Sequence, residues 1–287
     1  MKVLVIGGTR YFGKRLVHSL INEGHEIWVV SRGQVEDDFG AKVHRLKADR
    51  NNKSDLAKAV ERLKFDVVVD QVCMNAEQAK AAVEIFAEKT PFYVMTSTMS
   101  VYNWGANLRE EEVNPFMYHA QTPKNPMEEY AEGKRSAENV FANQNFFKWA
   151  FARFPVVVGE DDYTLRLHNQ VKRVKEGSPI YYPNLEARFS FITSEDAARS
   201  LLWLIHGRRE GIFNFASEDV LKLGELVGMI EKMTGKKANL LKEPSEEAWS
   251  PFGIPSDWFM NVDKAKSEGF QAKPLKEWMG PLLQKMN

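Results

Sequence analysis

The chain has 287 residues, of which 44% are hydrophobic, so it can bury the core of one large domain or of two unequal lobes. Its 39 basic and 39 acidic residues balance, which argues against a general attraction to nucleic acid or to an anionic membrane. The single cysteine, Cys73, excludes an internal disulfide and favours a reducing compartment.

The first 158 residues alternate apolar runs with amphipathic segments, which is typical of a parallel sheet with helices on both faces. We predict strands where apolar residues run together and helices where they recur every three or four positions. The predicted strands are residues 2–8, 25–32, 42–49, 65–72, 91–98 and 147–159. The predicted helices are residues 12–23, 54–63, 76–89 and 126–144.

After Gly159 the regular alternation stops, and we expect a smaller α/β lobe over residues 159–287 that binds substrate. Its predicted helices are residues 161–177, 194–206, 221–234 and 274–285, and its predicted strands are 188–193 and 211–217. The strand near 211–217 is expected to return to the main sheet. The sequence thus predicts a Rossmann-type doubly wound parallel sheet over residues 1–158, followed by the substrate lobe.

The segment "KVLVIGGTRYFGKRL" places glycines where a strand turns into a helix. Gly7 allows a sharp turn, Gly8 allows a ligand to approach the main chain, and Gly13 allows the helix to pack closely on the sheet. Free N–H groups at the start of a helix bind a pyrophosphate. The segment therefore predicts a dinucleotide site, with cofactor contacts from Gly7, Gly8, Thr9, Arg10, Tyr11, Phe12 and Gly13.

The end of the second predicted strand indicates which nucleotide binds. NAD sites place an acidic residue there for the ribose 2′-OH, whereas NADP sites place an arginine near the 2′-phosphate. Here Ser31 and Arg32 stand in that position, and Arg10 lies on the preceding turn. We expect NADP, with NAD as the alternative if both arginines are ordinary surface residues. Asp49, after the third strand, is assigned either to the adenine or to an exposed loop.

A second motif combines Tyr130 and Lys134, which share one face of the predicted helix 126–144. A lysine ammonium beside a phenol favours the phenolate, which can exchange a proton with a substrate alcohol. Upstream, Ser97 and Thr98 end the fifth predicted strand, at the edge where ligands bind in doubly wound sheets. A Tyr-x-x-x-Lys pair alone carries little weight, but its order and position after the glycine turn favour an oxidoreductase.

These segments together resemble the short-chain dehydrogenase/reductase superfamily, in its extended branch of NAD(P)-dependent epimerases and dehydratases. "TSTMSVY", "RFPVVVGEDDYTLR" and "FSFITSEDAARSLL" add to the resemblance, which covers nearly the whole chain. It implies that Thr98, Tyr130 and Lys134 are catalytic and that Lys134 also binds the nicotinamide ribose. The implied activity is hydride transfer at a carbonyl or secondary alcohol, with a sugar nucleotide as one candidate substrate.

The chain departs from the family pattern in its substrate region. Asn103 stands where sugar-nucleotide epimerases usually have glycine, and Arg188 is one residue out of register with a diphosphate-binding arginine. "GEDDYTLR" resembles a reductase-like subgroup in which Arg166 faces the substrate. Arg153 lies inside an apolar strand, so it needs either an acidic partner or the substrate. Arg153, Arg166 and Arg188 are therefore our candidate substrate residues.

Two alternatives from a different functional class remain: a non-catalytic NADP-binding sensor and an RNA-associated protein of the same fold. Six histidines without ligand spacing predict no metal site, and the neutral charge predicts no nucleic-acid partner. The resemblance permits a homodimer, in which Val140, Phe141, Phe146 and Phe147 would take part unless they pack in the core. With no signal peptide and no run of 18 apolar residues, we expect a cytoplasmic protein without membrane contact.

Overall fold

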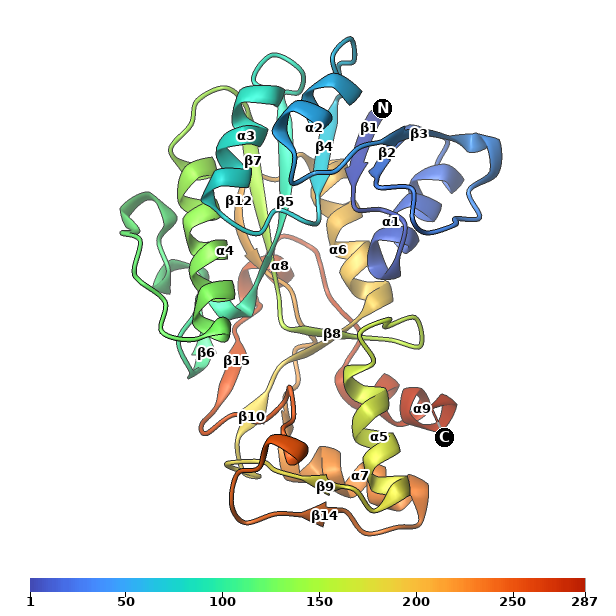
Figure 1. Ribbon diagram of the computed structural model, residues 1–287, viewed down its shortest axis with the longest axis vertical. Helices are drawn as coiled ribbons and strands as arrows, with labels where there is room; N and C mark the ends of the chain where they lie inside the picture. The colour runs from blue at the N-terminus through green and yellow to red at the C-terminus, as the bar shows by residue number, and fades with distance from the viewer. Residues whose placement is uncertain (287) are drawn as a thin grey trace. The chain divides into compact units, whose positions relative to one another are not determined.

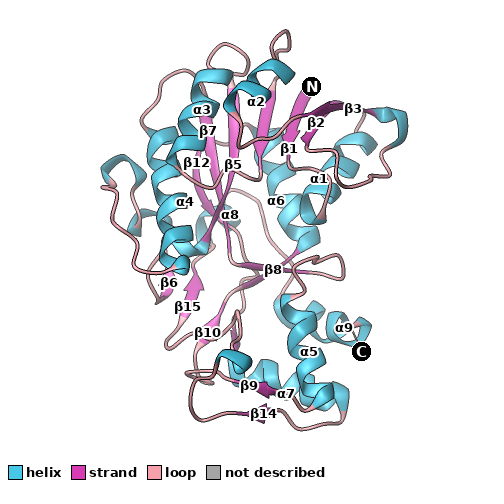
Figure 2. Ribbon diagram, viewed as in Figure 1, coloured by secondary structure: helices cyan, strands magenta, loops and turns pink. Residues whose placement is uncertain are grey.

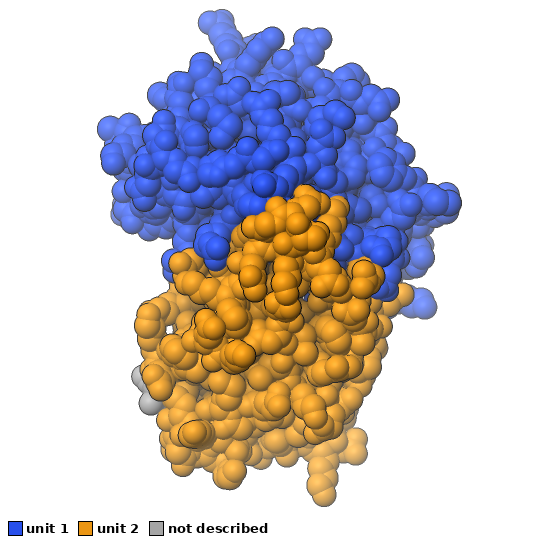
Figure 3. Space-filling view, turned by 180° about the vertical axis from the view of Figure 1, so that it is seen from behind, with its two compact units in different colours: residues 1–102, 110–154, 197–214 blue, residues 103–109, 155–196, 215–287 orange. Residues whose placement is uncertain are grey.

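The computed structural model describes residues 1–286 (Figure 1). It forms two compact units, coloured separately in Figure 3. Unit 1 contains Met1–Tyr102, Glu110–Phe154 and Ala197–Asn214. Unit 2 contains Asn103–Arg109, Pro155–Asp196 and the chain from Phe215 onward. The chain thus first enters unit 2 at Asn103 and enters it again at Pro155, four residues before the predicted substrate lobe. It also returns to unit 1 over Ala197–Asn214, which is more than the single predicted strand.

Unit 1 is built on a seven-stranded parallel sheet in the order β12-β7-β5-β4-β1-β2-β3, which confirms the predicted α/β fold (Figure 2). Its strands are β1 (Lys2–Ile6), β2 (Glu26–Ser31), β3 (Val43–Lys47), β4 (Val67–Asp70), β5 (Phe92–Thr98), β7 (Lys148–Phe154) and β12 (Gly211–Asn214). Its helices are α1 (Tyr11–Asn22), α2 (Lys53–Ala59), α3 (Ala76–Phe86), α4 (Pro126–Ala142) and most of α6 (Ser194–Gly207). Short 3-10 turns are η1 (Gly40–Lys42), η2 (Met99–Val101), η3 (Glu110–Glu112) and η4 (Pro115–Met117).

Helices cover both faces of this sheet, with α2, α3 and α4 together on one face (Figure 1). Their apolar side chains form one buried cluster with alternate residues of the central strands, which explains why these strands are apolar on both faces. Phe141 and Phe147 belong to this cluster and Val140 packs against it, so core packing accounts for three of the four residues considered for a dimer contact. Phe146 is 63% exposed.

Unit 2 holds three small sheets, with strand orders β13-β10-β15-β6, β11-β8 and β14-β9. Its strands are β6 (Gly105–Leu108), β8 (Val156–Val158), β9 (Pro179–Ile180), β10 (Arg188–Phe189), β11 (Phe191–Thr193), β13 (Leu221–Lys222), β14 (Asn239–Leu240) and β15 (Trp258–Met260). Its helices are α5 (Arg166–Glu176), α7 (Leu223–Thr234), α8 (Asp263–Ser267) and α9 (Leu275–Lys285), with the 3-10 turn η5 (Glu246–Ala248). Its core includes fully buried Phe189, Phe191 and Phe252.

Two predicted strands are each divided in the structure. The run 147–159 forms β7 and β8, which are separated by Pro155. Proline has no N–H for a sheet ladder, so the strand pairing is interrupted there, and β8 pairs with β11 instead of continuing in the seven-stranded sheet. The run 188–193 likewise forms β10 and β11 in different sheets. No helix within residues 1–286 is long and apolar enough to cross a membrane.

Candidate active site

The glycine turn joins β1 to α1 and has no room for side chains. Gly7 has φ of 85°, and a Cβ there would lie 2.8 Å from Cγ1 of Val72. A Cβ on Gly8 would lie 2.9 Å from Val5 and Val17, and one on Gly13 would lie 2.8 Å from the Gly7 carbonyl oxygen. Each glycine therefore keeps the turn and α1 close to the sheet, as the sequence predicts.

The start of α1 offers a site for a phosphate group. Arg10, the N-cap residue, makes no side-chain capping bond, and the first turn carries no acidic residue. Arg10 has φ of −135°, an extended conformation that any residue adopts, which explains why arginine fits where the family often has glycine. Beside the turn, Nε2 of Gln71 is buried and has no hydrogen-bond partner within residues 1–286. These features fit a bound dinucleotide, with Thr9 and Phe12 half-buried and Tyr11 buried beside the turn.

The end of β2 carries positive rather than negative side chains. Arg32 is exposed and makes no hydrogen bond or ion pair with the described residues. Ser31 pairs in register with Lys47 of β3, a cation that the sequence analysis missed. Two of the acidic residues that follow β2 have cationic partners: Asp37 binds Arg45 through Nε at 3.0 Å, and Asp38 binds Lys14 and His18. Glu36 is exposed and has no ion pair among residues 1–286. Asp49 is half-buried and accepts a bond from the N–H of Asn51, so it caps its own turn.

Lys134 is the most constrained of the predicted catalytic residues. Its side chain lies on α4 and the residue is only 2% exposed. Nζ donates hydrogen bonds to the carbonyl oxygens of Cys73 at 2.7 Å and Thr96 at 2.9 Å. Cys73 follows β4 and Thr96 lies in the last three residues of β5, so the ammonium joins the carboxyl-terminal regions of two strands. One N–H of the ammonium remains for a ligand.

Tyr130 lies one helical turn before Lys134 on α4, with its ring centroid 6.0 Å from Nζ. The tyrosine is 38% exposed, so its phenol can reach a ligand. Thr98 ends β5, and its Oγ1 accepts from the Ser100 N–H at 3.1 Å and bonds the Ser100 hydroxyl at 3.3 Å. Ser97 instead donates to buried Glu138 at 2.6 Å, which leaves Thr98 as the hydroxyl at the strand end.

A buried ionic cluster lies under this edge and was not found from the sequence. Arg50, in the loop after β3, donates from Nε and Nη2 to Oδ2 of Asp70 at 3.0 and 2.7 Å. Tyr93 donates its hydroxyl to the same oxygen at 2.7 Å, and burial raises the pKa of Tyr93 well above its ordinary value. An aspartate ending an otherwise apolar strand was the available signal, since such a carboxylate needs a partner.

Arg153 has no role left for a substrate. Its Nε and Nη2 bind both carboxylate oxygens of Glu138, at 3.0 and 2.5 Å. The remaining N–H groups go to the Tyr102 hydroxyl and to the carbonyl oxygens of Glu110 and Val113. All five donors are therefore used inside unit 1, so the structure leaves none for the predicted substrate contact of Arg153. The acidic partner considered from the sequence is Glu138.

In unit 2, Arg188 is also paired. Its Nε and Nη2 donate to Oδ2 of Asp257 at 3.0 and 2.5 Å, and its guanidinium lies 4.7 Å from the ring centroid of Phe259. The hydrogen bond from Arg188 holds the pKa of the Asp257 carboxyl below its ordinary value. This arginine is thus fixed on the surface of unit 2, and the structure adds nothing to its predicted substrate role.

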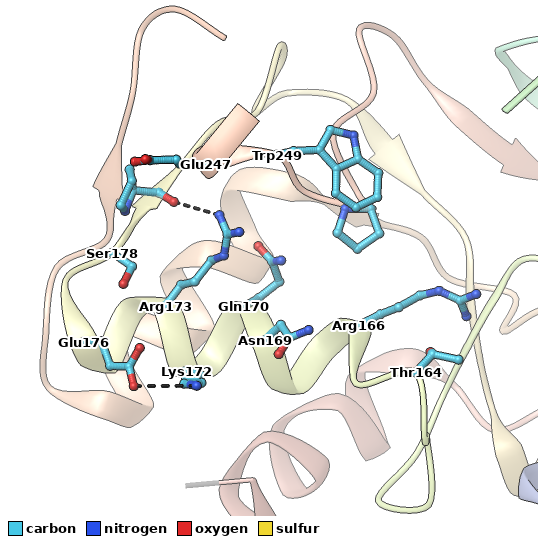
Figure 4. Close-up of a pocket in the computed structure, with 12 residues that line it drawn as sticks. Thr164, Arg166, Asn169, Gln170, Lys172, Arg173, Glu176, Ser178, Glu247 and Trp249 are labelled. Atoms are coloured by element: carbon cyan, nitrogen blue, oxygen red, sulfur yellow. Dashed lines mark hydrogen bonds and ion pairs between the residues drawn. The ribbon is translucent and has the colours of Figure 1, made fainter. Parts of the chain in front are cut away.

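Arg166 begins α5 and lines a pocket of about 640 Å³ within unit 2 (Figure 4). It makes no hydrogen bond or ion pair with the residues described here. In the same pocket Lys172 pairs with Glu176 at 4.0 Å, whereas Trp249 is exposed. The remaining lining residues are Thr164, Asn169, Gln170, Arg173, Ser178, Pro179, Glu247 and Pro251. The pocket thus combines an unpaired cation with an exposed aromatic ring.

Three side chains of metal-binding type meet in unit 1, although the sequence spacing gave no sign of it. Oε2 of Glu23 lies 3.1 Å from Nε2 of His25 and 2.7 Å from Nε2 of His206. Hydrogen bonds between the imidazoles and the carboxylate account for this arrangement. We assign no metal to it.

Comparison with known proteins identifies the family. The model of the NAD dependent epimerase/dehydratase family matches residues 3–216. Among curated proteins, the Arabidopsis thaliana chloroplast stem-loop binding protein of 41 kDa b is 26% identical over 295 aligned positions, covering 92% of this chain and 73% of that protein. A dTDP-6-deoxy-L-talose 4-dehydrogenase (NAD(+)) of Aggregatibacter actinomycetemcomitans is 22% identical, covering 76% of this chain and 84% of that protein.

Among solved structures, the Thermus thermophilus UDP-glucose 4-epimerase complex with NAD superposes with a TM-score of 0.76 at 18% identity. The match covers 100% of this chain and 99% of that one, so the fold is shared over the full length. The family match spans the glycine turn, the Tyr130–Lys134 pair and β12. The chain belongs to the NAD dependent epimerase/dehydratase family.

Proposed function

We propose that the protein is an NADP-preferring oxidoreductase that transfers hydride at a carbonyl or a secondary alcohol. The observation that carries this proposal is the buried Lys134 ammonium, held by two carbonyl oxygens one helical turn from the accessible phenol of Tyr130. A purely structural lysine would not need an exposed tyrosine beside it. The glycine turn supplies the second requirement, a place for the pyrophosphate.

The residues divide the work of such a reaction. A bound nicotinamide cofactor supplies or accepts the hydride. Tyr130 exchanges a proton with the substrate oxygen as that oxygen gains or loses charge. Lys134 supplies a positive charge near the phenol and uses its remaining N–H to hold the cofactor ribose. Thr98 orients the substrate oxygen with its hydroxyl, which the Ser100 N–H fixes in place.

The preference for NADP rests on the end of β2. Arg32 has no partner among residues 1–286, and Lys47 lies in register beside Ser31. A 2′-phosphate would give both cations a counter-charge, whereas a ribose 2′-OH would find no acidic acceptor there. Three similar solved structures, among them the Thermus thermophilus UDP-glucose 4-epimerase, are complexes with NAD, so the proposal departs from these three on this point.

The pocket of unit 2 supports an anionic substrate with a planar ring. Arg166 offers an unpaired guanidinium, and Trp249 offers a face on which a base can stack. A sugar nucleotide has both features, and the similar solved structures include complexes with UDP-glucose and UDP-glucuronic acid. We therefore propose a nucleoside diphosphate sugar as the substrate class.

Calorimetric titration of the purified protein with NADP and NAD tests the cofactor, after the preparation has been checked for nucleotide carried through purification. We expect NADP to bind at least about tenfold more tightly, a difference of about 1.4 kcal/mol. Incubation of deuterated NADPH with nucleoside diphosphate keto sugars then tests hydride transfer. Tighter binding of NAD would overturn the NADP assignment, and failure to bind either would overturn the proposed function.

RNA binding is the second candidate, because one curated relative is named a stem-loop binding protein. We favour the enzyme, because 39 acidic residues balance 39 basic ones and phosphate contacts need clustered cations. A filter-binding titration with a stem-loop RNA at increasing salt separates the two. Submicromolar binding with a steep salt dependence would favour the RNA-binding candidate.

A further inference from the structure

We infer that the Arg50–Asp70–Tyr93 cluster positions residues 71–74, the segment that contacts both the glycine turn and Lys134. The inference rests on the proposed function, since it assigns these buried residues to the same cofactor site. The cluster does not touch the reacting groups. It acts through the main chain that follows β4.

The cluster is unusually costly to bury. The Arg50 side chain is 5% exposed and the Asp70 side chain is fully enclosed. Removing two charges from water offsets most of their mutual attraction, so a buried pair of this kind is weak support for stability alone. In addition, Nη1 of Arg50 is buried and has no hydrogen-bond partner within residues 1–286. An apolar pair would fill the same space without that cost.

Asp70 connects the cluster to the segment. Oδ2 receives the three bonds from Arg50 and Tyr93, while Oδ1 accepts from the N–H of Val72 at 3.0 Å. The preceding N–H, that of Gln71, donates to the Ile6 carbonyl oxygen at 3.1 Å. Since the Asp70 carboxylate is held on one oxygen, its other oxygen fixes where the main chain leaves β4.

The segment reaches both halves of the cofactor site. Val72 lies against Gly7, and the Gln71 side chain lies over Gly13, within 2.7 Å of where its Cβ would be. Cys73 supplies a carbonyl acceptor for Nζ of Lys134. A displacement of this segment would therefore change the phosphate turn and the lysine together. The need to hold this segment in place explains why the protein keeps the buried Arg50–Asp70 pair.

Cys73 provides a readout that does not depend on the cofactor. It is the only cysteine, it lies within the segment, and it is fully buried. Burial raises the pKa of the Cys73 thiol to about 12, so it reacts with a disulfide reagent only when the segment opens. The labelling rate under native conditions therefore measures the opening of residues 71–74.

Two double variants separate positioning from simple stabilisation. Arg50→Met/Asp70→Asn removes both charges but keeps an acceptor for the Val72 N–H, whereas Arg50→Met/Asp70→Leu removes the acceptor as well. We expect the leucine variant to label Cys73 at least about tenfold faster than the original protein and to bind NADP at least about tenfold more weakly. A tenfold change is the size of effect expected when one hydrogen bond to a charged group is lost. The asparagine variant should stay within about threefold of the original protein in both measurements.

Lys148→Met is the control, because it removes an exposed ion pair with Glu210 at the start of β7, whereas the segment follows the opposite end of the parallel strand β4. Tyr93→Phe is the milder variant if the leucine variant does not fold, and we expect about threefold faster labelling from it. Equal labelling and equal affinity in the asparagine and leucine variants, or no change with Tyr93→Phe, would overturn the inference. If the original protein binds neither cofactor but the leucine variant still labels faster, the proposed function fails while the positioning of the segment stands.

Discussion

Glu138 of α4 and Arg153 of β7 form an ion pair from which solvent is fully excluded, with both side chains 0% exposed. The pair binds through two hydrogen bonds, and Oε1 of Glu138 also accepts from the Ser97 hydroxyl at 2.6 Å. It therefore joins α4, which carries Tyr130 and Lys134, to β5, which ends in Thr98. The pair therefore helps to hold α4 against the sheet.

Arg153→Met should destabilise the protein by about 3–5 kcal/mol, because it leaves the Glu138 carboxylate buried without its partner. Urea unfolding followed by circular dichroism measures the loss. Glu138→Gln/Arg153→Met, which removes both charges, should recover most of it. A folded, stable Arg153→Lys variant that binds cofactor normally but turns over no substrate would instead return this arginine to a substrate role.

Arg32→Ala should weaken NADP binding about tenfold or more while leaving NAD binding within about twofold. The reason is that a 2′-phosphate is present only in NADP, and the arginine is free to bind it. Lys42→Ala, which removes an exposed cation at η1, is the matched control. Equal weakening of both cofactors would place Arg32 at the pyrophosphate or in the fold rather than at the 2′-phosphate.

The parallel sheet of unit 1 was predictable because its signals are local. Strands β1, β2, β4 and β5 are mostly apolar runs, and the glycines between β1 and α1 stand where a tight turn needs them. Lys134 was predictable for the same reason, since a spacing of four residues places it beside Tyr130 on one helix face. The carbonyl oxygens that Lys134 binds could not be predicted, because they belong to residues 61 and 38 positions away that only the fold brings beside it.

The buried charges could not be predicted, because their partners are distant in sequence. Asp70 meets Arg50 across 20 residues, and Arg153 meets carbonyl oxygens 40 and 43 residues away. An arginine in an apolar strand signals that some partner exists, but only tertiary structure decides between a carboxylate and a substrate. Lys47 was missed for the related reason that the register of β2 and β3 brings it beside Ser31.

Acid should weaken unit 2 through Asp257. The hydrogen bond from Arg188 holds the pKa of Asp257 below its ordinary value of 3.8, so this carboxylate stabilises the fold above that pH. The contribution is lost as pH falls below 3.8 toward the lower pKa of the folded protein. Asp257→Asn should therefore flatten the fall of the unfolding free energy between pH 5 and pH 2, by less than about 1 kcal/mol because the pair is partly exposed. Glu36→Gln is the control, because Glu36 is exposed and has no ion pair among residues 1–286. This substitution should leave the profile unchanged.

Tyr130→Phe should lower kcat for hydride transfer by about 10²–10⁴-fold and leave the NADP dissociation constant within about threefold. The phenol donates and accepts the proton, whereas the ring, which remains, supplies whatever packing the cofactor needs. Lys134→Met should lower kcat and raise the NADP dissociation constant, because it leaves the carbonyl oxygens of Cys73 and Thr96 without their donor. Steady-state rates with nucleoside diphosphate keto sugars and calorimetry measure the two effects separately. A Tyr130→Phe variant that binds NADP normally and keeps every detectable turnover would favour a cofactor-binding sensor over an enzyme, because proton exchange by this phenol is what the enzymatic proposal requires.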